Sequence, residues 1–512
     1  MDSNKNNQNL ISDVLDLNLS NIEVEFGEAN DLLIRKVTLQ DSNKTRTAII
    51  GIDGLINATD AQNFIIHLLA VDLSIIDERL PKNSDHIFDF LFDSRISMFD
   101  ANQSNKIQEM YDNILNGHII VLIDGVARFM TFDCKGWQSR GISEPNTEKS
   151  LRGPKDSFVE TIRFNTAMLR RRLRDSRLRF DVHNVGTRSK TDVFVAYIDG
   201  LTNPEFVKIA NDRIKAIDID AVLNTYELMT LIEDKHHTFL PRLSETERPD
   251  RVMKALTEGQ IAILVDGSPF VILGPFHFTS AFSAIDDYYN PPTFASFKRI
   301  MRYFAYFAVI LIPSVYIALS AFHQEMIPTS LLISIINQRA SNPFSTFVEM
   351  LIIASLFEIL REASLRKPDA IGDSMTIVGS LIIGQTIVQA GLVSNASIIV
   401  GSITTIASFL LSSSRINVSA RIIRIIFMFI AASFGFYGII LSFIILITHL
   451  ASITSFNQAY LAPMAPFNFS DQKDQIFKTS LRRMKKRPKI FNVLDEIRSN
   501  LGESTGGTSH GS

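Results

Sequence analysis

The chain has 512 residues, of which 46% are hydrophobic, and a formal net charge of −3. This length allows several domains, and the small net charge points to no particular class of partner. The single cysteine, Cys134, excludes a disulfide framework and a cysteine-based zinc cluster. We interpret Cys134 as a buried apolar side chain, with a reactive thiol as the alternative.

The N-terminal segment is polar and acidic, and it contains no positively charged region followed by an apolar run. This pattern is not that of a secretory signal peptide, so we expect the first half of the chain to stay in the cytosol. We predict that residues 1–28 are disordered, because this end is rich in asparagine and other polar residues.

The first half of the chain contains two motifs that each occur twice. The sequence IDGL stands at residues 52–55 and again at residues 198–201. GHIIVLIDG at residues 117–125 returns as GQIAILVDG at residues 259–267. The offsets of 146 and 142 residues nearly agree, which indicates a repeated unit rather than two coincidences.

Both copies have the same order of predicted elements. Each begins with a β-hairpin, at residues 32–53 and 178–199, in which β-branched and aromatic runs are separated by polar turn residues. A helical stretch and then the repeated apolar strand follow. Apolar strands beside helices predict sheets covered by helices, so we expect an α/β or α+β fold. We place repeat 1 at residues 29–150 and repeat 2 at residues 179–298.

The Asp-Gly pairs in these motifs have two interpretations. They could bind a metal or a phosphate, but Asp-Gly after an apolar run is typical of a tight turn, because glycine adopts positive φ and aspartate caps its own backbone. We therefore predict turns. The run Asp234-Lys-His-His237 is a poor metal site, since adjacent histidines point in different directions. No Walker loop, GxGxxG, HExxH or GxSxG motif occurs, so we expect no enzyme activity, no cofactor and no metal.

Residues 144–160, EPNTEKSLRGPKDSFVE, form a connecting segment between the two copies. Its proline and glycine residues predict an extended or turning chain, after which a helix starts with Asp156 as the N-cap. Because arginine accumulates along this helix, we assign residues 151–178 to a linking basic helix.

The arginines of this region have two interpretations. They are Arg163, Arg170, Arg171, Arg172, Arg174, Arg177 and Arg179. They form either a solvated face or a basic surface that binds a neighbouring subunit or anionic lipid headgroups. No aromatic platform is interleaved with them, which argues against nucleic acid.

The second half of the chain has the composition of a membrane domain. Residues 303–322 contain no charge and are long enough to cross a bilayer. Lys298, Arg299 and Arg302 precede them, as the positive-inside rule expects for a cytosolic flank. We therefore predict an α-helical, polytopic transmembrane domain at residues 299–470.

Two carboxylates stand in the next apolar block, residues 344–360. Glu349 and Glu358 are candidates for a functional site, because a carboxylate inside a membrane is costly and usually faces protein or water. The alternative is structural pairing, and Arg361 lies at a helical neighbour distance from Glu358. Glu349 has no such neighbour in the sequence, so it is the stronger candidate.

A third apolar block, residues 375–393, is unusually polar for a membrane helix. Gln385 and Gln389 are four residues apart and share one helix face, Val388 lies beside them, and Gly384 lets another helix approach closely. These four residues are candidates for lining a water path with an apolar gate. The alternative is a packed bundle core in which the amides bond between helices.

The last apolar blocks leave the number of crossings open. Residues 398–411 are short for a full span, and residues 425–470 suffice for one long span or for two short ones with a break at Gly435 and Gly438. We predict that residues 471–512 form a basic cytosolic tail with a disordered end. Because both ends of the chain are then cytosolic, the number of crossings is even. We favour four crossings, with six as the alternative.

Five segments distributed along the chain occur in a characteristic combination. They are EPNTEKSLRGPKDSFVE, LVDGSPFVILGPFHF, DDYYNPP, FEILREASLRKPDAIG and IGQTIVQAGLVS. Together they resemble the A-subunit family of spore germination nutrient receptors (GerA-type). The likeness extends from about residue 30 to residue 490 and departs at both ends of the chain.

The resemblance implies a membrane subunit in the inner membrane of an endospore, in contact with membrane lipid and with both termini on the core side. It implies three protein partners: a polytopic B subunit that binds the nutrient, a lipoprotein C subunit, and further copies of this chain in a ring. The ring is expected to be a nutrient-gated channel for monovalent cations. The connecting segment supplies candidates for contact between subunits, namely Glu144, Pro145, Glu148, Arg152, Gly153 and Pro154.

Two other functions remain as hypotheses. A secondary transporter usually shows a repeat within its membrane half, whereas the repeat of this chain lies in its first half. A membrane-anchored scaffold with no pathway of its own has no distinguishing sequence pattern, so an ion measurement has to separate it from a channel.

Prolines after the second repeat predict a stiff connection to the first span. The motifs GPFHF and DDYYNPP precede the membrane segment directly. We therefore expect residues 290–302 to transmit movement from the repeats to the spans. A flexible Gly/Ser insertion there should leave assembly intact and uncouple the response to a nutrient.

Overall fold

The computed structural model describes most of the chain between Leu10 and Arg498. The residues outside its description are 1–9, 28, 40–43, 71–83, 95–100, 137–144, 146, 149, 151, 235–237, 341, 366–384, 412, 470 and 499–512. The chain divides into two compact units. Unit 1 comprises Met1–Glu233, Leu243–Pro275 and Lys485–Ser512, and unit 2 comprises Asp234–Arg242 and Phe276–Met484.

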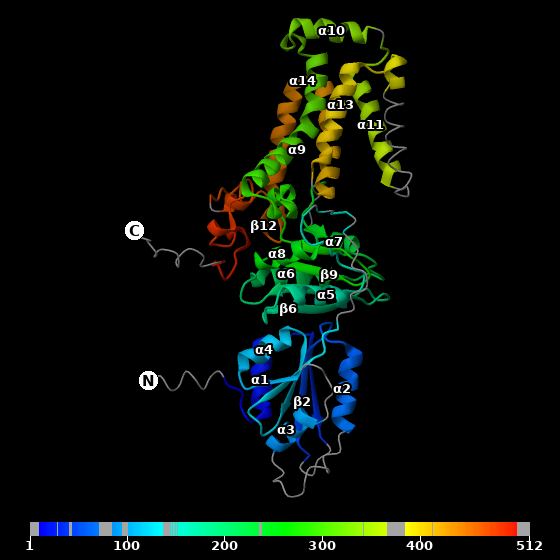
Figure 1. Cartoon of the computed structure of the whole chain (residues 1–512). Coiled ribbons are helices and arrows are strands. Elements are labelled where there is room, and N and C mark those ends of the chain that lie inside the picture. Colours follow the sequence, from blue (N-terminus) through cyan, green and yellow to red (C-terminus); the bar gives the residue numbers. More distant parts are fainter. Residues whose placement is uncertain are drawn as a thin grey trace, which may run out of the picture. The chain divides into compact units, whose positions relative to one another are not determined.

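Repeat 1 of unit 1 is a sheet with helices on both faces (Figure 1). Its elements are α1 (Leu15–Phe26), β1 (Leu32–Thr38), β2 (Arg46–Ile52), α2 (Ala58–Ala70), α3 (Ser84–Ser94), β3 (Ala101–Ser104), α4 (Ile107–Leu115), β4 (His118–Ile123) and β5 (Phe129–Asp133). The antiparallel sheet has the order β1-β2-β4-β5-β3. Successive apolar residues of the central strands face opposite layers. Ile50 and Ile120 pack with α1 and α4, whereas Ile49 and Val121 pack with α2 and α3.

Repeat 2 has the same architecture. Its elements are α5 (Ile162–Arg172), β6 (Leu178–Val185), β7 (Thr191–Ile198), α6 (Pro204–Lys215), α7 (Thr225–Ile232), β8 (Ser244–Thr246), α8 (Pro249–Thr257), β9 (Ile261–Val265) and β10 (Val271–Gly274). The sheet order β6-β7-β9-β10-β8 matches that of repeat 1 strand for strand. The predicted hairpins and the predicted mixed α/β class are therefore confirmed.

One buried asparagine in each repeat holds the same backbone loop. Asn18 of α1 accepts a hydrogen bond from Ser12 N at 3.0 Å and donates one to Ser12 O at 2.7 Å. Asn165 of α5 makes the same two bonds to Val159, at 2.9 and 2.6 Å. In both repeats the bonded residue lies six positions before the asparagine. Helices α1 and α5 therefore occupy equivalent positions.

The aspartates of the second repeated motif cap these two helices. Asp124 Oδ1 accepts from Leu15 N at 3.1 Å, and Asp266 Oδ1 accepts from Ile162 N at 3.0 Å. A carboxylate stabilises a helix N-terminus because the first amide groups have no partner within the helix. The glycines after both aspartates have φ angles of 88° and 81°, so the predicted tight turns are confirmed.

The predicted disorder of residues 1–28 is wrong for the helix α1. Leu15, Leu19, Ile22 and Phe26 are buried against the sheet at helical spacing. Polar residues fill the positions between them, so the composition of this end concealed an amphipathic helix.

The predicted linking helix at residues 151–178 is also wrong, because α5 is the first helix of repeat 2. The helix begins at Ile162 with Thr161 as its N-cap residue, and the chain from Arg152 to Thr161 is not helical. Asp156 is therefore not the N-cap. Its carboxylate forms an ion pair with Arg172 instead.

The boundary predicted at residue 471 does not separate a tail from the folded chain. Leu494 N donates to Leu201 O at 3.0 Å, and Arg487 Nε donates to Thr257 O at 3.0 Å. Val493 packs against the apolar core of repeat 2. The C-terminal residues up to Arg498 thus complete repeat 2.

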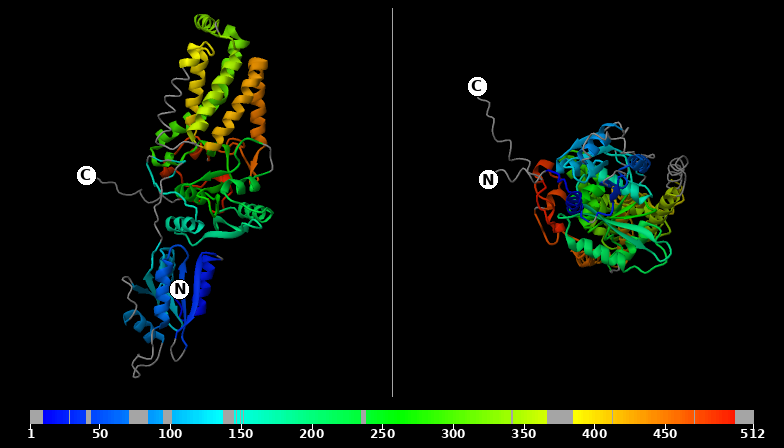
Figure 2. Two further views of the ribbon diagram at one scale, coloured as in Figure 1. Left: turned by 90° about the vertical axis from the view of Figure 1, so that its right-hand side faces the viewer. Right: turned by 90° about the horizontal axis from the view of Figure 1, so that it is seen from below.

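Unit 2 consists mainly of long apolar helices. They are α9 (Pro292–Ala321), α10 (Thr329–Arg339), α11 (Thr346–Leu365), α13 (Asn395–Phe409) and α14 (Ser414–Ser452), with a small hairpin of β11 (Thr454–Ser455) and β12 (Gln458–Ala459). The short 3₁₀ helices of unit 2 are η3 (Phe278–Phe282), η4 (Ile285–Tyr289), η5 (Gln324–Met326), η6 (Asp471–Asp474) and η7 (Leu481–Arg483). Among the described residues, α9 and α14 are long and apolar enough to cross a membrane. The long helices run side by side, and α10 lies across their ends (Figures 1 and 2).

Helix α14 is a pair of antiparallel legs joined at Gly435. This residue has φ 59° and ψ −142°, outside the helical range. Ser419 of the first leg donates to the carbonyl of residue 239, and His449 Nε2 of the second leg lies 2.9 Å from the hydroxyl of residue 238. Both outer ends of α14 therefore lie at the same short segment. Of the two alternatives for residues 425–470, the structure shows the one with a break, and the break lies at Gly435.

Helices α11 and α13 run in the same direction side by side. Glu349 near the start of α11 bonds to the start of α13, and Arg361 near the end of α11 donates to Ser408 Oγ at 2.8 Å. The first ten residues of the helix predicted at residues 375–393 lie outside the described residues.

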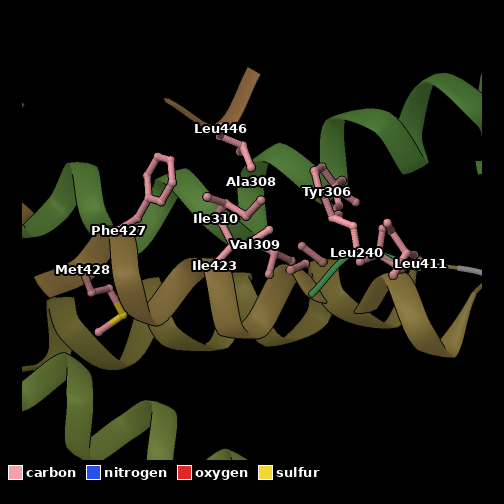
Figure 3. Close-up of a cluster of buried hydrophobic side chains, with 14 of the residues drawn as sticks. Leu240, Tyr306, Ala308, Val309, Ile310, Leu411, Ile423, Phe427, Met428 and Leu446 are labelled. Atoms are coloured by element: carbon pink, nitrogen blue, oxygen red, sulfur yellow. The ribbon is translucent and has the colours of Figure 1, made fainter. Parts of the chain in front are cut away.

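The helices of unit 2 share one apolar core. Tyr306, Val309 and Ile310 of α9 pack together with Ile423 and Phe427 of α14 (Figure 3). Because α9 also contacts α11 and α13, it is the central helix of the bundle.

The linker expected at residues 290–302 belongs to unit 2 itself. Arg299 and Arg302 are buried and both donate to Asp287, so this stretch is fixed within unit 2 rather than suspended between two domains. The prediction of one proline-stiffened linker is corrected. The chain passes between the units at four points, which are 233–234, 242–243, 275–276 and 484–485.

Candidate functional site

Glu349 is a buried carboxylate at the N-terminus of α13. Its Oε2 accepts hydrogen bonds from Ser394 N at 3.2 Å, Ser394 Oγ at 2.8 Å and Ser397 Oγ at 2.6 Å. Its Oε1 accepts from Asn342 Nδ2 at 3.2 Å and lies 3.9 Å from Arg339 Nε. The carboxylate therefore caps a helix whose first amide groups lack partners of their own.

These contacts explain why Glu349 had no visible partner in the sequence. Its partners on α13 lie 45 and 48 residues away, far beyond helical neighbour distance. The side chain joins the end of α10, the start of α11 and the start of α13. Of the two interpretations of Glu349, the structure supports the structural joint.

Glu358 forms an ion pair with Arg421 of α14. The predicted pair with Arg361 is therefore wrong, although the pairing is structural as that alternative proposed. Arg361 instead donates to Ser408 Oγ at 2.8 Å, and its guanidinium carbon lies 5.3 Å from the ring centre of Phe409. Glu358 and Arg361 therefore form contacts with other helices instead of the predicted contact with each other within α11.

Gln385 and Gln389 lie on the exposed surface of unit 2. They belong to a short helix, residues 385–389, which ends before Gly391 with its φ of 67°. Ile387 of the same helix packs against the apolar core. The two amides thus point away from the core of a single copy, so they are not the packed amides of the alternative interpretation.

The other two pore-lining candidates are less exposed or not described. Val388 is half-buried beside the two amides, and Gly384 lies outside the described residues. Ser394, the N-cap of α13, follows five residues after Gln389. The capping by Glu349 therefore fixes the chain directly behind the candidate pore residues.

The connecting segment is bound to repeat 2 of the same chain. The carboxylate of Glu148 forms an ion pair with Arg251. Buried Arg248 donates to Glu148 O at 3.1 Å and to Pro154 O at 3.2 Å, and its Nη2 lies 2.7 Å from Asp250 Oδ2. One guanidinium therefore binds both ends of the loop from residue 148 to residue 154.

This loop separates the candidates for subunit contact into two groups. Pro145 is buried, and Glu148 and Pro154 bond to repeat 2, whereas Arg152 and Gly153 are exposed at the tip of the loop. Glu144 lies outside the described residues. The exposed tip is the part of the segment that a second molecule can reach.

Most arginines after the connecting segment form ion pairs within unit 1. Arg170 is 1% exposed and donates to both carboxylate oxygens of Asp31, at 2.7 and 2.9 Å. Arg163 forms an ion pair with Asp53. Both pairs join α5 to repeat 1. The predicted basic surface is therefore largely neutralised inside the chain, while Arg174 remains exposed.

A buried charge cluster joins the start of α9 to the segment after α14, and the sequence patterns did not reveal it. Arg299 Nε and Arg302 Nη1 donate to Asp287 Oδ2 at 3.0 and 2.8 Å. Arg299 also donates to Asp474 O at 2.5 Å, and Lys478 Nζ donates to Asp287 O at 2.8 Å. Burial alone would raise the pKa of Asp287, but the two arginines outweigh it and hold the pKa below its usual range.

No cluster of three or more His, Cys, Asp or Glu side chains suited to a metal occurs in the described parts of the chain. Of the run Asp234-Lys-His-His237, the last three residues lie outside the description. Asp234 accepts a hydrogen bond from Phe456 N at 3.0 Å, so its carboxylate fixes the β11–β12 hairpin.

The chain matches known proteins over nearly its whole length. The family model described as "Bacillus/Clostridium GerA spore germination protein" matches residues 20–490. Spore germination protein KA of Bacillus subtilis is 36% identical over 489 residues, which are 96% of this chain and 89% of the relative. Spore germination protein GerLA of Bacillus cereus is 33% identical over 93% of this chain and 95% of its own length.

A solved structure also matches part of the chain. It is the N-terminal domain of the A subunit of the Bacillus megaterium spore germinant receptor GerK3. The match has 27% sequence identity and a TM-score of 0.39, and it covers 52% of this chain and 97% of the solved one.

Proposed function

Because the chain belongs to the GerA family of spore germination proteins, we propose that it is the membrane-embedded A subunit of a nutrient receptor that triggers germination. In this proposal, copies of the chain form a ring around a path for monovalent cations, and the nutrient opens the path. The subunit contributes no catalytic step and no cofactor.

The exposed amides of Gln385 and Gln389 carry the channel proposal. An amide that faces lipid is costly, whereas water or a neighbouring polar group satisfies it. A ring of copies would turn this surface toward a common axis. Half-buried Val388 would then narrow the path between polar residues, which is the arrangement of a gate that closes by excluding water.

We further propose six crossings rather than four. The described helices supply five crossings, namely α9, α11, α13 and the two legs of α14, and the even number expected from two cytosolic termini then favours six. Helix α13 has 15 residues and runs along the 20-residue α11, so we count it as a span. An even number of crossings leaves both termini on one side, which we assign to the cytosolic core of the spore.

Membership of the family supports the partners that we propose. We propose that a polytopic B subunit binds the nutrient and that a lipoprotein C subunit completes the receptor. The exposed tip of the connecting segment, Arg152 and Gly153, is our candidate contact with a neighbouring copy. Arg248 holds this tip in place, so little chain entropy is lost when a partner binds it.

A non-conducting scaffold is the second candidate. In a single copy, Glu349 and Glu358 both bond between helices, which makes unit 2 a closed and stable bundle. Such a bundle could relay a signal without a path of its own. A secondary transporter has less support, because the duplication lies in unit 1.

Cation flux into proteoliposomes tests the channel proposal. The chain is reconstituted alone and with its B and C partners, and flux is recorded with and without nutrient. Gln389→Leu should lower the flux about tenfold, which corresponds to about 1.4 kcal/mol added to the barrier. Val388→Ala should raise the flux in the absence of nutrient, because it widens the apolar constriction.

Matched substitutions outside the candidate path serve as controls. Gln338→Leu changes an exposed amide on α10, and Val418→Ala changes an exposed valine on α14. Both should leave the flux unchanged. Equal flux in all four variants would refute the pore assignment, and no flux under any condition would favour the scaffold.

A further inference from the structure

The first four turns of α9 have an inverted distribution of side chains. Phe294, Phe297 and Phe304 are 48%, 58% and 71% exposed. On the opposite side of the helix, Arg299 and Arg302 are buried. A helix at a water-exposed surface has the reverse arrangement, with its charges outside and its apolar residues inside. The outer face of these turns therefore fits an apolar environment.

This face continues the apolar surface of the first span. Helix α9 has 30 residues and a length of about 45 Å, whereas the hydrocarbon core of a bilayer is about 30 Å thick. About 15 Å of the helix therefore remains for the headgroup layers. Lys298 Nζ lies 4.7 Å from the ring centre of Phe294, and a cation beside an aromatic ring suits a layer that contains both apolar and charged groups.

The segment after α14 presents the same chemistry. Phe467, Phe469 and Phe477 are 66%, 78% and 57% exposed. Arg482 and Arg483 follow, and both are exposed. Aromatic side chains and cations thus stand together on a segment that begins where the last apolar leg ends.

Buried contacts hold these two segments together as one surface. Arg299 Nη1 donates to Asp474 O at 2.5 Å, and Lys478 N donates to Ser296 Oγ at 2.9 Å. Lys478 Nζ donates to Asp287 O at 2.8 Å. Because the side chains of Arg299 and Lys478 are buried, the exposed aromatic residues of both segments stand on one rigid frame.

We propose that residues 292–304, 461–469 and 471–483 form an interfacial collar that binds the headgroup layer of an anionic phospholipid bilayer. The phenylalanines insert below the headgroups, and Arg482 and Arg483 bind the lipid phosphates. The collar rests on the proposed membrane function of unit 2, and it moves the membrane contact of the chain outward from residue 303. A bilayer is the occupant because the apolar face is continuous with the span and cations border it.

Fluorescence quenching by lipids tests the collar on the full-length chain. In a Cys134→Ala background, Phe297→Cys or Phe469→Cys is labelled with a small fluorophore. The protein is placed in nanodiscs whose lipids carry a quencher either near the headgroup or near the chain end. We expect both labels to be quenched more strongly by the headgroup quencher.

Two control positions separate the collar from the membrane proposal. Ile444→Cys on α14 replaces a side chain that is 60% exposed, and Leu223→Cys in repeat 2 replaces one that is 69% exposed. The label at 444 should be quenched by the deep quencher and the label at 223 by neither. If 444 is quenched and 297 and 469 are not, the collar is refuted while the membrane proposal stands. If 444 is not quenched, both are refuted.

A change of lipid charge tests the role of the two arginines. Replacing part of the phosphatidylcholine by phosphatidylglycerol should raise the shallow quenching at 469 at least about twofold. The Arg482→Gln/Arg483→Gln variant should lose this increase. An Arg35→Gln/Lys36→Gln variant, which removes two exposed cations of β1, should keep it. The proposal would be overturned if the shallow quenching at 469 did not depend on lipid charge. It would also be overturned if a second copy shielded the label at 297 from both lipid and water.

Discussion

Repeats 1 and 2 have the same strand order and the same buried asparagine, yet they differ in what is attached to them. Repeat 2 binds the connecting segment through Arg248 and the C-terminal residues through Leu201. Repeat 1 has a different ion pair, which lies at its surface and joins Arg46 to Asp124. Identical backbone contacts therefore occur both in a repeat that binds these two segments and in a repeat that does not.

The difference in burial has an energetic meaning. Arg248 is 1% exposed, whereas the side chain of Arg46 is 54% exposed. An exposed ion pair contributes little because water screens it. A buried guanidinium that loses its partners is costly in free energy. Its contacts therefore favour a single arrangement of the groups that it binds.

Removing the buried arginine should have the largest effect on this comparison. Arg248→Met keeps the apolar stem but leaves the Asp250 carboxylate and two loop carbonyls without their donor. We expect a loss of about 3–5 kcal/mol in unfolding free energy. Hydrogen exchange of α8 and of the loop from residue 148 to residue 154, measured on the full chain in detergent, reports the loss.

Arg46→Met is the matched control in repeat 1. It removes a guanidinium that also binds an aspartate, but at the surface. Exchange in the helices of repeat 1 should change little. An equally large loss for both variants would show that attachment of further chain does not distinguish the repeats.

The two buried asparagines should respond alike. Asn18→Ala and Asn165→Ala each remove the partner of one half-buried backbone N–H and of one C=O, so each should cost about 1–2 kcal/mol. Exchange at the start of α1 reports the first and exchange at the start of α5 reports the second. A much smaller loss at Asn18 would mean that the backbone equivalence of the repeats is geometric but not energetic.

Low pH should reduce the stability of the two repeats by different amounts. We expect this difference to be smaller than the effects of the substitutions above. Burial alone would raise the pKa of Asp124, but hydrogen bonds from Arg46 and Leu15 N hold the pKa below its usual value. Because the folded pKa is lowered, this stabilisation is complete above the ordinary pKa of about 4 and is lost as the pH falls through the folded value. Asp124→Asn should therefore lower the melting temperature at pH 7, and the effect should become smaller as the pH falls below about 4.

Asp266→Asn is the comparison in repeat 2. In repeat 1 the carbonyl that accepts the amide proton of Asp124 belongs to Arg46, whereas in repeat 2 the carbonyl that accepts that of Asp266 belongs to Asp192. The residue at this position is thus a cation in repeat 1 and an anion in repeat 2. At pH 7, Asp266→Asn should therefore lower the melting temperature less than Asp124→Asn does. Melting curves of both variants between pH 3 and pH 7 measure the difference, and equal curves would contradict it.

Local patterns in the sequence predicted the elements that depend on neighbouring residues. The hairpins, the Asp-Gly turns and the break at Gly435 follow from β-branched runs and from glycine at positive φ. Helix α1 was missed, because a composition argument was applied to a segment whose apolar residues recur at helical spacing.

Side-chain partners far apart in the chain could not be predicted in this way. Glu349 finds the N-terminus of α13, and Glu358 finds Arg421, 63 residues away. Arg170 pairs with Asp31 across 139 residues. In the sequence, each of these charged residues is equally compatible with a functional role and with exposure to solvent. Its structural role becomes visible only with the neighbour that packs against it in the folded chain.

The sequence by itself determined the duplication, the change from a mixed α/β half to an apolar helical half, and the family, because these are recorded in periodicity and in motifs. Only the tertiary structure decided which charges are neutralised and where the domain boundaries lie. It showed that α5 opens repeat 2, that the C-terminal residues complete it, and that Arg299 and Arg302 are buried on Asp287. A charge and its counter-charge meet through folding of the whole chain, so no local window contains both.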